Sequence, residues 1–318
     1  MERGRSGLDG LLGRCPAMER VRRDVELLGP SDERVHVFGE SGTGKEVVAR
    51  ALHASSLRAR RRLVTVNAAG FSDELLVGEL FGHARGAFTG AVAARDGYVA
   101  EADGGTLFVD EVADMSPLAQ VRLLRFLENG EYQRLGETLT RRADVRVVSA
   151  TNVDLARRVR EGRFRLDLWF RLKGQILVLP PLRERGEDVL LLARHFLRTH
   201  AAARGLPPPA LSRAAEAALL AHAWPGNVRE LQSEMRLLVV RVAGRPIAAE
   251  DLSDDVRGHP ARRTGTLKAA VERHAAEIVQ QVLARHGGNV ARAAAELGMT
   301  RQGLWARVRR LGLASESA

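Results

Sequence analysis

The stretch Val35-His36-Val37-Phe38-Gly39-Glu40-Ser41-Gly42-Thr43-Gly44-Lys45 decides the fold of this chain. Its first four residues form a short apolar run, and residues 46–53 carry apolar side chains at helical spacing, so a strand, a loop and a helix are predicted. Glycines allow the loop to wrap around phosphate oxygens, with several N–H groups and the start of the helix directed at the anion. Lys45 would then reach the β- and γ-phosphates. The predicted site for a nucleoside triphosphate consists of Gly39, Glu40, Ser41, Gly42, Thr43, Gly44, Lys45 and Glu46.

One position of this loop departs from the general phosphate-loop pattern G-x-x-x-x-G-K-[ST]. The pattern has a hydroxyl after the lysine that helps to hold magnesium, and here the residue is Glu46. The alternative interpretation is a glycine-rich turn that binds nothing. The strand before the loop, the helix after it and a pair of carboxylates further along the chain favour the nucleotide site.

Two adjacent carboxylates, Asp110 and Glu111, follow the apolar run 106–109. Buried parallel strands place functional residues at their carboxyl ends, which is the sheet edge that also carries the phosphate loop. Asp110 would hold Mg²⁺, and Glu111 would polarise the attacking water as a general base. Asn152, after a predicted strand at 145–150, is placed to contact the γ-phosphate or that water. The alternative is that the two carboxylates only solvate a loop.

The composition indicates an intracellular protein that meets nucleic acid. The chain has 318 residues and a formal net charge of +10, and residues 262–318 hold ten basic and four acidic side chains. This concentration of positive charge at one end favours contact with nucleic acid. The single cysteine, Cys15, excludes an internal disulfide, and no apolar run approaches the roughly 20 residues of a membrane span. We therefore predict a cytoplasmic location.

The order of the predicted elements divides the chain into five parts. Strands and helices alternate until Pro180-Pro181, and the pattern is helical after that point. Asn227 is predicted as the N-cap of a helix that starts at Val228. The predicted fold class is α/β, a parallel sheet with flanking helices, joined to a helical lid subdomain and an all-α C-terminal domain. The parts are a lead-in at 1–10, the α/β subdomain at 11–180, the helical subdomain at 181–246, a polar linker at 247–265 and the C-terminal domain at 266–318.

The C-terminal domain has the pattern of a helix-turn-helix. Two short helices, at 290–297 and from Thr300 to about residue 311, are joined by a turn at Gly298, and Thr300 is placed to cap the second helix. Arg301 and Gln302 would reach base edges from the start of that helix, whereas the later arginines would contact phosphates. The alternative is a small helical bundle with a basic exterior. The predicted DNA-binding residues are Thr300, Arg301, Gln302, Trp305, Arg307, Arg309 and Arg310.

An uncharged hexapeptide follows a predicted helix at 74–81. It consists of Gly86, Ala87, Phe88, Thr89, Gly90 and Ala91. Its small residues would let the tip of a loop change shape, while the Phe88 ring supplies contact area to another protein. The alternative is a turn whose Phe88 packs inward.

Together these motifs resemble those of the bacterial enhancer-binding proteins of the NtrC type, the AAA+ activators of sigma-54 RNA polymerase. The resemblance covers nearly the whole chain, from about Leu12 to Leu313. A glutamate after the phosphate-loop lysine is usual in that family, which accounts for Glu46. The stretches that carry the resemblance are 39–46, 79–83, 86–91, 104–111, 164–165 and 224–231.

The resemblance implies an AAA+ P-loop NTPase that hydrolyses ATP with Mg²⁺ between the subunits of a ring. Asn67 matches the asparagine that senses hydrolysis through Glu111. Arg165 and Arg171 match the arginine fingers that reach into the neighbouring subunit, and Arg229 matches the sensor arginine of the lid.

The resemblance also implies the partners. The hexapeptide 86–91 is similar to the loop that engages sigma-54 and, powered by hydrolysis, remodels the closed promoter complex of the holoenzyme into the open complex. The C-terminal domain is similar to the Fis type, which binds paired upstream enhancer sites in double-stranded DNA as a dimer. The family assembles from dimers into rings that are typically hexameric.

Two features differ from the family pattern. Relatives commonly carry a receiver or ligand-sensing domain before the AAA+ part, whereas only a short lead-in precedes Leu11. We expect either control by a separate regulatory protein or a truncated chain. Gly303 and Ala306 also stand where relatives often place a contacting threonine and a basic residue, so the operator sequence of relatives does not transfer.

Two other functions compete with the activator. One is a DNA-binding repressor that uses nucleotide only as a ligand for oligomerisation, but family members of that kind have lost the hexapeptide, which is complete at 86–91. The other is a general AAA+ unfoldase or helicase loader, which the same hexapeptide and the Fis-like end disfavour.

Overall fold

The computed structural model describes residues 8, 10–71, 73–88, 91–242, 244–257, 282, 285–286, 290–300 and 303–304. The chain divides into two units, Met1–Arg257 and Gly258–Ala318. The finer boundaries predicted from the sequence stay predictions. Among the described residues, no helix is both long and apolar enough to cross a membrane.

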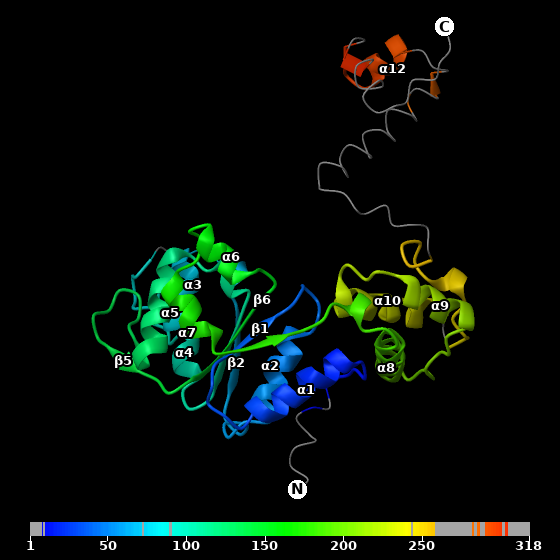
Figure 1. Ribbon diagram of the computed structural model, residues 1–318. Helices are drawn as coiled ribbons and strands as arrows, with labels where there is room; N and C mark the ends of the chain where they lie inside the picture. Colours follow the sequence, from blue (N-terminus) through cyan, green and yellow to red (C-terminus); the bar gives the residue numbers. More distant parts are fainter. Residues whose placement is uncertain are drawn as a thin grey trace. The chain divides into compact units, whose positions relative to one another are not determined.

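A five-stranded parallel sheet forms the centre of the first unit (Figure 1). Its strands are β1 (Val35–Phe38), β2 (Leu63–Asn67), β3 (Thr106–Asp110), β6 (Arg146–Thr151) and β7 (Gln175–Val178). They lie in the order β2-β3-β6-β1-β7, and each neighbouring pair is parallel. The strand order reverses at β1, between β6 and β7. Ligands of open α/β sheets bind beyond the carboxyl ends of the strands at such a point, which here is where the glycine-rich loop begins.

Helices cover both faces of the sheet, as the α/β prediction requires (Figure 1). On one face, α1 (Pro16–Leu28) and α2 (Lys45–Ala54) pack on inward side chains such as Val37, Phe108 and Val148. On the other face, α3 (Asp73–Phe81), α5 (Pro117–Asn129) and α7 (Leu166–Lys173) cover the alternate residues, such as Leu107 and Val147. Strands buried on both faces explain the unbroken apolar runs in the sequence. Shorter elements complete this part: η1 (Ala68–Gly70), α4 (Tyr98–Glu101), η2 (Val112–Asp114), β4 (Glu131–Tyr132), β5 (Arg141–Arg142) and α6 (Leu155–Arg160).

A helical subdomain follows the sheet. Its elements are η3 (Leu182–Glu184), α8 (Asp188–Ala202), α9 (Arg213–Ala221), α10 (Asn227–Val242) and η4 (Ala249–Asp251). They surround a separate apolar core that includes Trp224, which is fully buried and whose indole N–H donates to the carbonyl of Leu219 at 2.9 Å. The lid helices predicted from the sequence are therefore present.

The predicted capping role of Asn227 is wrong. Its side-chain oxygen accepts a hydrogen bond from the backbone N–H of Leu182 at 2.8 Å, and so ties α10 to η3. The carboxylate of Glu230 instead accepts the N–H of Gly226 at the start of this helix, at 2.6 Å. A tertiary contact has taken the atom that a local cap would use.

The described part of the second unit agrees with a helix-turn-helix. Helix α12 (Val290–Glu296) ends before Gly298, which has a φ of +62°. The hydroxyl of Thr300 then accepts the N–H of Gly303 at 3.1 Å, so the predicted cap is confirmed. Leu304 is buried in a small cluster with Ala293 and Ala294. The predicted DNA contacts Arg301, Gln302, Trp305, Arg307, Arg309 and Arg310 lie outside the described residues.

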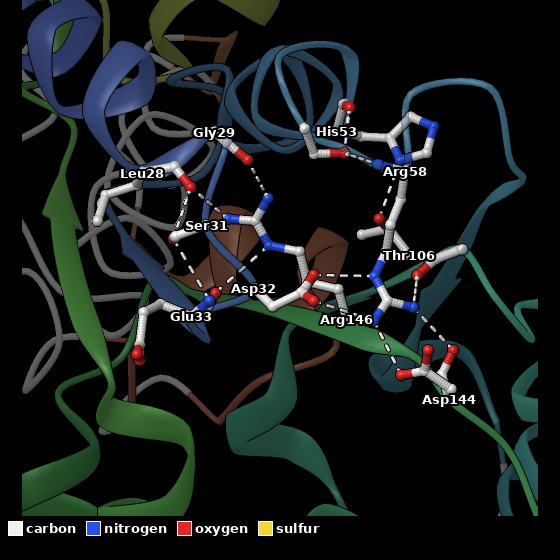
Figure 2. Close-up of polar contacts among 12 residues, drawn as sticks. Leu28, Gly29, Ser31, Asp32, Glu33, His53, Arg58, Thr106, Asp144 and Arg146 are labelled. Carbon is white, nitrogen blue, oxygen red and sulfur yellow. Dashed lines mark hydrogen bonds and ion pairs between the residues drawn. The ribbon is translucent and has the colours of Figure 1, made fainter.

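A buried arginine fastens α1 to the amino edge of the sheet, opposite the glycine-rich loop (Figure 2). Arg146, at the start of β6, is 2% exposed, and its guanidinium donates to the carbonyls of Leu28 at 2.8 Å and Gly29 at 2.7 Å. These are the last carbonyls of α1, where the helix dipole favours a positive charge. Beside it, Arg58 pairs with Asp32 and Asp144.

Replacing Arg146 with Met should lower the free energy of unfolding by about 3 kcal/mol, because buried carbonyls lose their charged donor. Urea denaturation followed by circular dichroism measures this loss. The matched control is Arg142→Met, because Arg142 is 76% exposed and pairs with Glu131 on the surface. That change should cost less than about 1 kcal/mol. Equal losses in the two variants would contradict a structural role for the buried arginine.

Candidate nucleotide-binding site

The glycine-rich loop joins the carboxyl end of β1 to the first turn of α2. Gly44 precedes the helix with a φ of +103°, and no side chain caps the first N–H groups of α2. Free N–H groups at the start of a ten-residue helix form a site for an anion. The predicted strand, loop and helix are present, with the helix at Lys45–Ala54.

The helical subdomain holds this loop from the other side. The backbone N–H of Val228 donates to the carbonyl of Gly42 at 2.9 Å, and Arg229 donates to the hydroxyl of Ser41 at 3.1 Å. Gly42 has a φ of +78°, and a Cβ at this position would lie 2.4 Å from the carbonyl oxygen of Gly226. Glycine is therefore required here by both the backbone conformation and the close approach of α10.

A cavity of about 370 Å³ opens beside the loop. At one end it is lined by the loop and by the carboxylates Asp110 and Glu111. The rest of its lining includes apolar residues of the N-terminal segment, α1 and the helical subdomain, among them Leu11, Leu12, Met18, Leu192, Phe196 and Val228. An anion-binding loop and apolar lining in one cavity suit a nucleotide, whose phosphates are charged and whose base is largely apolar.

A buried carboxylate fixes the N-terminal segment against this cavity. Asp188, at the start of α8, is 3% exposed and accepts the backbone N–H groups of Arg14 at 2.5 Å and Cys15 at 3.1 Å. These bonds place Leu11 and Leu12 at the cavity wall, although they precede the first helix of the sheet domain.

Lys45 and the two carboxylates meet at the phosphate end of the cavity. The Lys45 ammonium lies 3.4 Å from Oε1 of Glu111 and donates to the carbonyl of Gly39 at 3.1 Å. The other oxygen of Glu111 accepts the backbone N–H of Asn152 at 3.2 Å. Burial, and then the charge of Glu111, raise the pKa of Asp110. Glu111 itself has a φ of +50°, a costly conformation for a residue other than glycine.

The other predicted site residues lie further out. Asn67 pairs with Asp110 in the register of β2 and β3, and its side-chain oxygen accepts the N–H of Ala69 at 2.9 Å. Arg165, just before α7, is exposed and pairs with Asp167 at 2.7 Å. Arg171, on α7, is also exposed. These three do not line the cavity within this chain, and their roles stay predictions.

The sequence pattern gave no sign of two arginines that hold the loop. Arg183 donates to both oxygens of Glu40, at 2.9 and 2.6 Å. Arg185, which is 3% exposed, donates to the carbonyls of Thr43 at 2.8 Å and Pro180 at 2.9 Å. Both follow the last strand, in a stretch without helical or strand periodicity.

The predicted polymerase-contact hexapeptide follows α3. Its Phe88 packs edge-on against the ring of His83, with ring centroids 5.0 Å apart, and the N–H of Gly86 donates to the carbonyl of Ala91 at 2.8 Å. Thr89 and Gly90 lie outside the described residues. The hexapeptide is thus closed at its base, with Phe88 against the end of α3.

Comparison with known proteins identifies the chain. Residues 11–177 match the sigma-54 interaction domain, residues 183–269 the AAA+ ATPase lid domain, and residues 271–311 the bacterial regulatory protein Fis family. The chain belongs to the sigma-54-dependent activators. The NtrC-type resemblance, the AAA+ fold class and the function as a sigma-54-dependent transcriptional activator are confirmed.

Several relatives of this activator are close in sequence and structure. It is 46% identical over 310 residues to the transcriptional regulatory protein ZraR of Klebsiella oxytoca, a match that spans 95% of this chain and 69% of the relative. It is 41% identical over 318 residues to the anaerobic nitric oxide reductase transcription regulator NorR of Salmonella paratyphi C, over 95% of this chain and 63% of NorR. The structure of NtrX from Brucella abortus in complex with ATP superposes with a TM-score of 0.73, at 35% identity, over 96% of this chain and 71% of NtrX.

The family defines the activity in outline. The activator is an AAA+ ATPase with a sigma-54 interaction domain, and it binds DNA through a Fis-type helix-turn-helix. The cavity between the sheet and the lid is the place in the described chain that combines a phosphate loop, a lysine and adjacent carboxylates.

Replacing Gly42 with Ala should weaken ATP binding by about tenfold or more, because the added Cβ pushes the start of α10 away from the loop. Titration with a fluorescent ATP analogue measures the affinity. The control is Gly70→Ala, because a Cβ at Gly70 meets nothing within 4 Å and its φ is not positive. Equal affinities of the two variants would contradict the tight fit between loop and lid.

Proposed function

We propose that this activator binds DNA upstream of a promoter and uses ATP hydrolysis to remodel the closed complex of sigma-54 RNA polymerase into the open complex. The observation that carries the proposal is the position of Glu111. Its carboxylate contacts Lys45 and the backbone of Asn152, while the two residues after it share an apolar core with α3, the helix that precedes the hexapeptide at 86–91. One residue thus joins the hydrolytic site to the predicted polymerase contact.

ATP is the proposed substrate of the cavity. The loop N–H groups and Lys45 would bind its phosphates, and Arg229, which already contacts Ser41, would face them from the lid. The NtrX structure with ATP supports this assignment. The apolar lining of the cavity would take the base.

Mg²⁺ is the proposed metal, held by Asp110. The described residues contain no group of three or more His, Cys, Asp or Glu side chains suited to a metal. Mg²⁺ fits a site of this kind, because it is commonly bound by one or two carboxylates, water and the phosphates of the substrate. It would supply charge neutralisation on the phosphates.

Glu111 would act as the general base. Lys45 and the N–H of Asn152 hold its two oxygens, so the carboxylate is oriented before substrate arrives. Asn67, at the end of the neighbouring strand, would respond to the state of Glu111. Asn152 would contact the γ-phosphate or the attacking water.

Arg165 and Arg171 would complete the site of a neighbouring subunit in a hexameric ring. Both are exposed, and the apolar side chains of Leu166 and Phe170 beside them are 54% and 64% exposed. Exposed apolar groups next to exposed arginines suit a contact between subunits. Dimers would be the units from which the ring assembles.

The hexapeptide would transmit hydrolysis to sigma-54. Val112 and Ala113, directly after Glu111, share one apolar core with Ala68 of η1 and with Leu76 and Val77 of α3. The hexapeptide follows that helix, so a shift at Glu111 has a packed route to it. Gly86, Ala87, Phe88, Thr89, Gly90 and Ala91 would form the contact.

The C-terminal domain would place the ring near its promoter. Thr300, Arg301, Gln302 and Trp305 would lie at base edges or beside them, and Arg307, Arg309 and Arg310 would contact phosphates. The Fis-type match supports binding of paired enhancer sites as a dimer. We place the protein in the cytoplasm, with its DNA and polymerase.

Replacing Glu111 with Gln should preserve ATP binding and reduce hydrolysis by about 100-fold or more, because the base is lost while the shape is kept. Promoter opening, detected by permanganate reactivity of unpaired thymines, should be lost with it. The control is Glu128→Gln, because Glu128 is exposed on α5. Unchanged hydrolysis in Glu111→Gln would remove this residue as the base, and promoter opening without hydrolysis would contradict the proposed function.

A further inference from the structure

The phosphate loop contains a negative charge. Glu40 is the second residue of the loop, and its carboxylate is 44% exposed. Loops that bind phosphates rely on N–H groups and positive charge, so a carboxylate at this place opposes the binding of a polyanion. The loop can hold a triphosphate well only if this charge is compensated.

Arg183 supplies the compensation from the helical subdomain. Its guanidinium donates to both oxygens of Glu40, at 2.9 and 2.6 Å, in a paired geometry that fixes both groups. Asn227 adds a third hydrogen bond to Glu40 at 3.1 Å. The bonds from Arg183, and the weaker one from Asn227, hold the pKa of Glu40 below its ordinary value, so the carboxylate is charged and paired.

The same contact closes the lid on the loop. Asn227 also donates to the carbonyl of Ser41 at 3.0 Å, and the next two residues, Val228 and Arg229, bond to Gly42 and Ser41. Glu40 therefore stands at one end of a row of lid contacts that runs along the loop. An unpaired Glu40 would disturb this row as well as the field at the phosphates.

We propose that Arg183 is a positioning residue for ATP turnover, which neutralises Glu40 so that the loop presents a positive field to the triphosphate. The inference rests on the proposed ATP site, but not on sigma-54 or DNA. Arg183 acts through Glu40 and the loop, and the pair is exposed enough for its effect to depend on salt.

The test compares the KM for ATP of the parent, Arg183→Gln, Glu40→Gln and the double variant. At low salt, Arg183→Gln should raise KM about tenfold, because one uncompensated charge then faces the phosphates. Glu40→Gln is the reference without this charge, and adding it to Arg183→Gln should bring KM to within about twofold of the value of Glu40→Gln, because no uncompensated charge then remains. Raising the salt should shrink the defect of Arg183→Gln, a response that a purely structural role would not give.

Arg194→Gln is the matched control, because Arg194 pairs with Glu216 at 2.6 Å on the same subdomain, away from the loop. Its KM should equal that of the parent. The inference is overturned if the double variant is as impaired as Arg183→Gln, or if Arg183→Gln keeps the KM of the parent. A parent that hydrolyses ATP without opening promoters would overturn the proposed function and leave this comparison intact, whereas a parent that binds no nucleotide would overturn both.

Discussion

The rest of this structure depends on one glycine-rich loop that two subdomains hold in place by direct contacts. The loop begins at the carboxyl end of β1, where the strand order reverses, and the lid reaches it from beyond the last strand. The contact is so close that Gly42 has room for no side chain against Gly226. The lid donates hydrogen bonds to the loop backbone and to Glu40. A movement of the lid therefore changes the shape of the phosphate site. A nucleotide that alters the loop therefore alters the lid.

The features that could be predicted from the sequence are those that depend on residues adjacent in the chain. The nucleotide site could be predicted from the run Val35 to Lys45 and from the pair Asp110-Glu111. In both stretches the apolar strand residues are followed directly by the loop or carboxylate residues of the site. The bonds from Arg183 to Glu40 and from Arg185 to Thr43 span 143 and 142 residues, and no periodicity marks them. The predicted cap at Asn227 failed for the same reason, since the backbone of a distant residue competes for its side chain. The contribution of the N-terminal segment to the cavity wall could not be predicted either, because it depends on hydrogen bonds to Asp188 of the lid, more than 170 residues away.

The residues after the proposed base and the helix before the proposed polymerase contact share one packed core. Glu111 is held in a left-handed conformation between a lysine and a backbone N–H, and its successors Val112 and Ala113 are buried against η1 and α3. Packed interiors respond to a shift at one residue by moving together rather than by absorbing it. The strained backbone of Glu111 and the dense packing behind it are the features that the proposed conversion of hydrolysis into movement of the loop at 86–91 requires. The lid contacts act on the opposite side of the same site.

The most direct test of this coupling is promoter opening by Thr89→Ala on supercoiled DNA with sigma-54 polymerase and ATP. Thr199→Ala, which alters an exposed threonine on α8 of the helical subdomain, serves as the control. Thr89→Ala is expected to hydrolyse ATP and bind DNA like the parent but to form no open complex, whereas the parent and the control do. Open-complex formation by Thr89→Ala at the rate of the parent would contradict the assignment of the hexapeptide as the part that transmits hydrolysis to the polymerase.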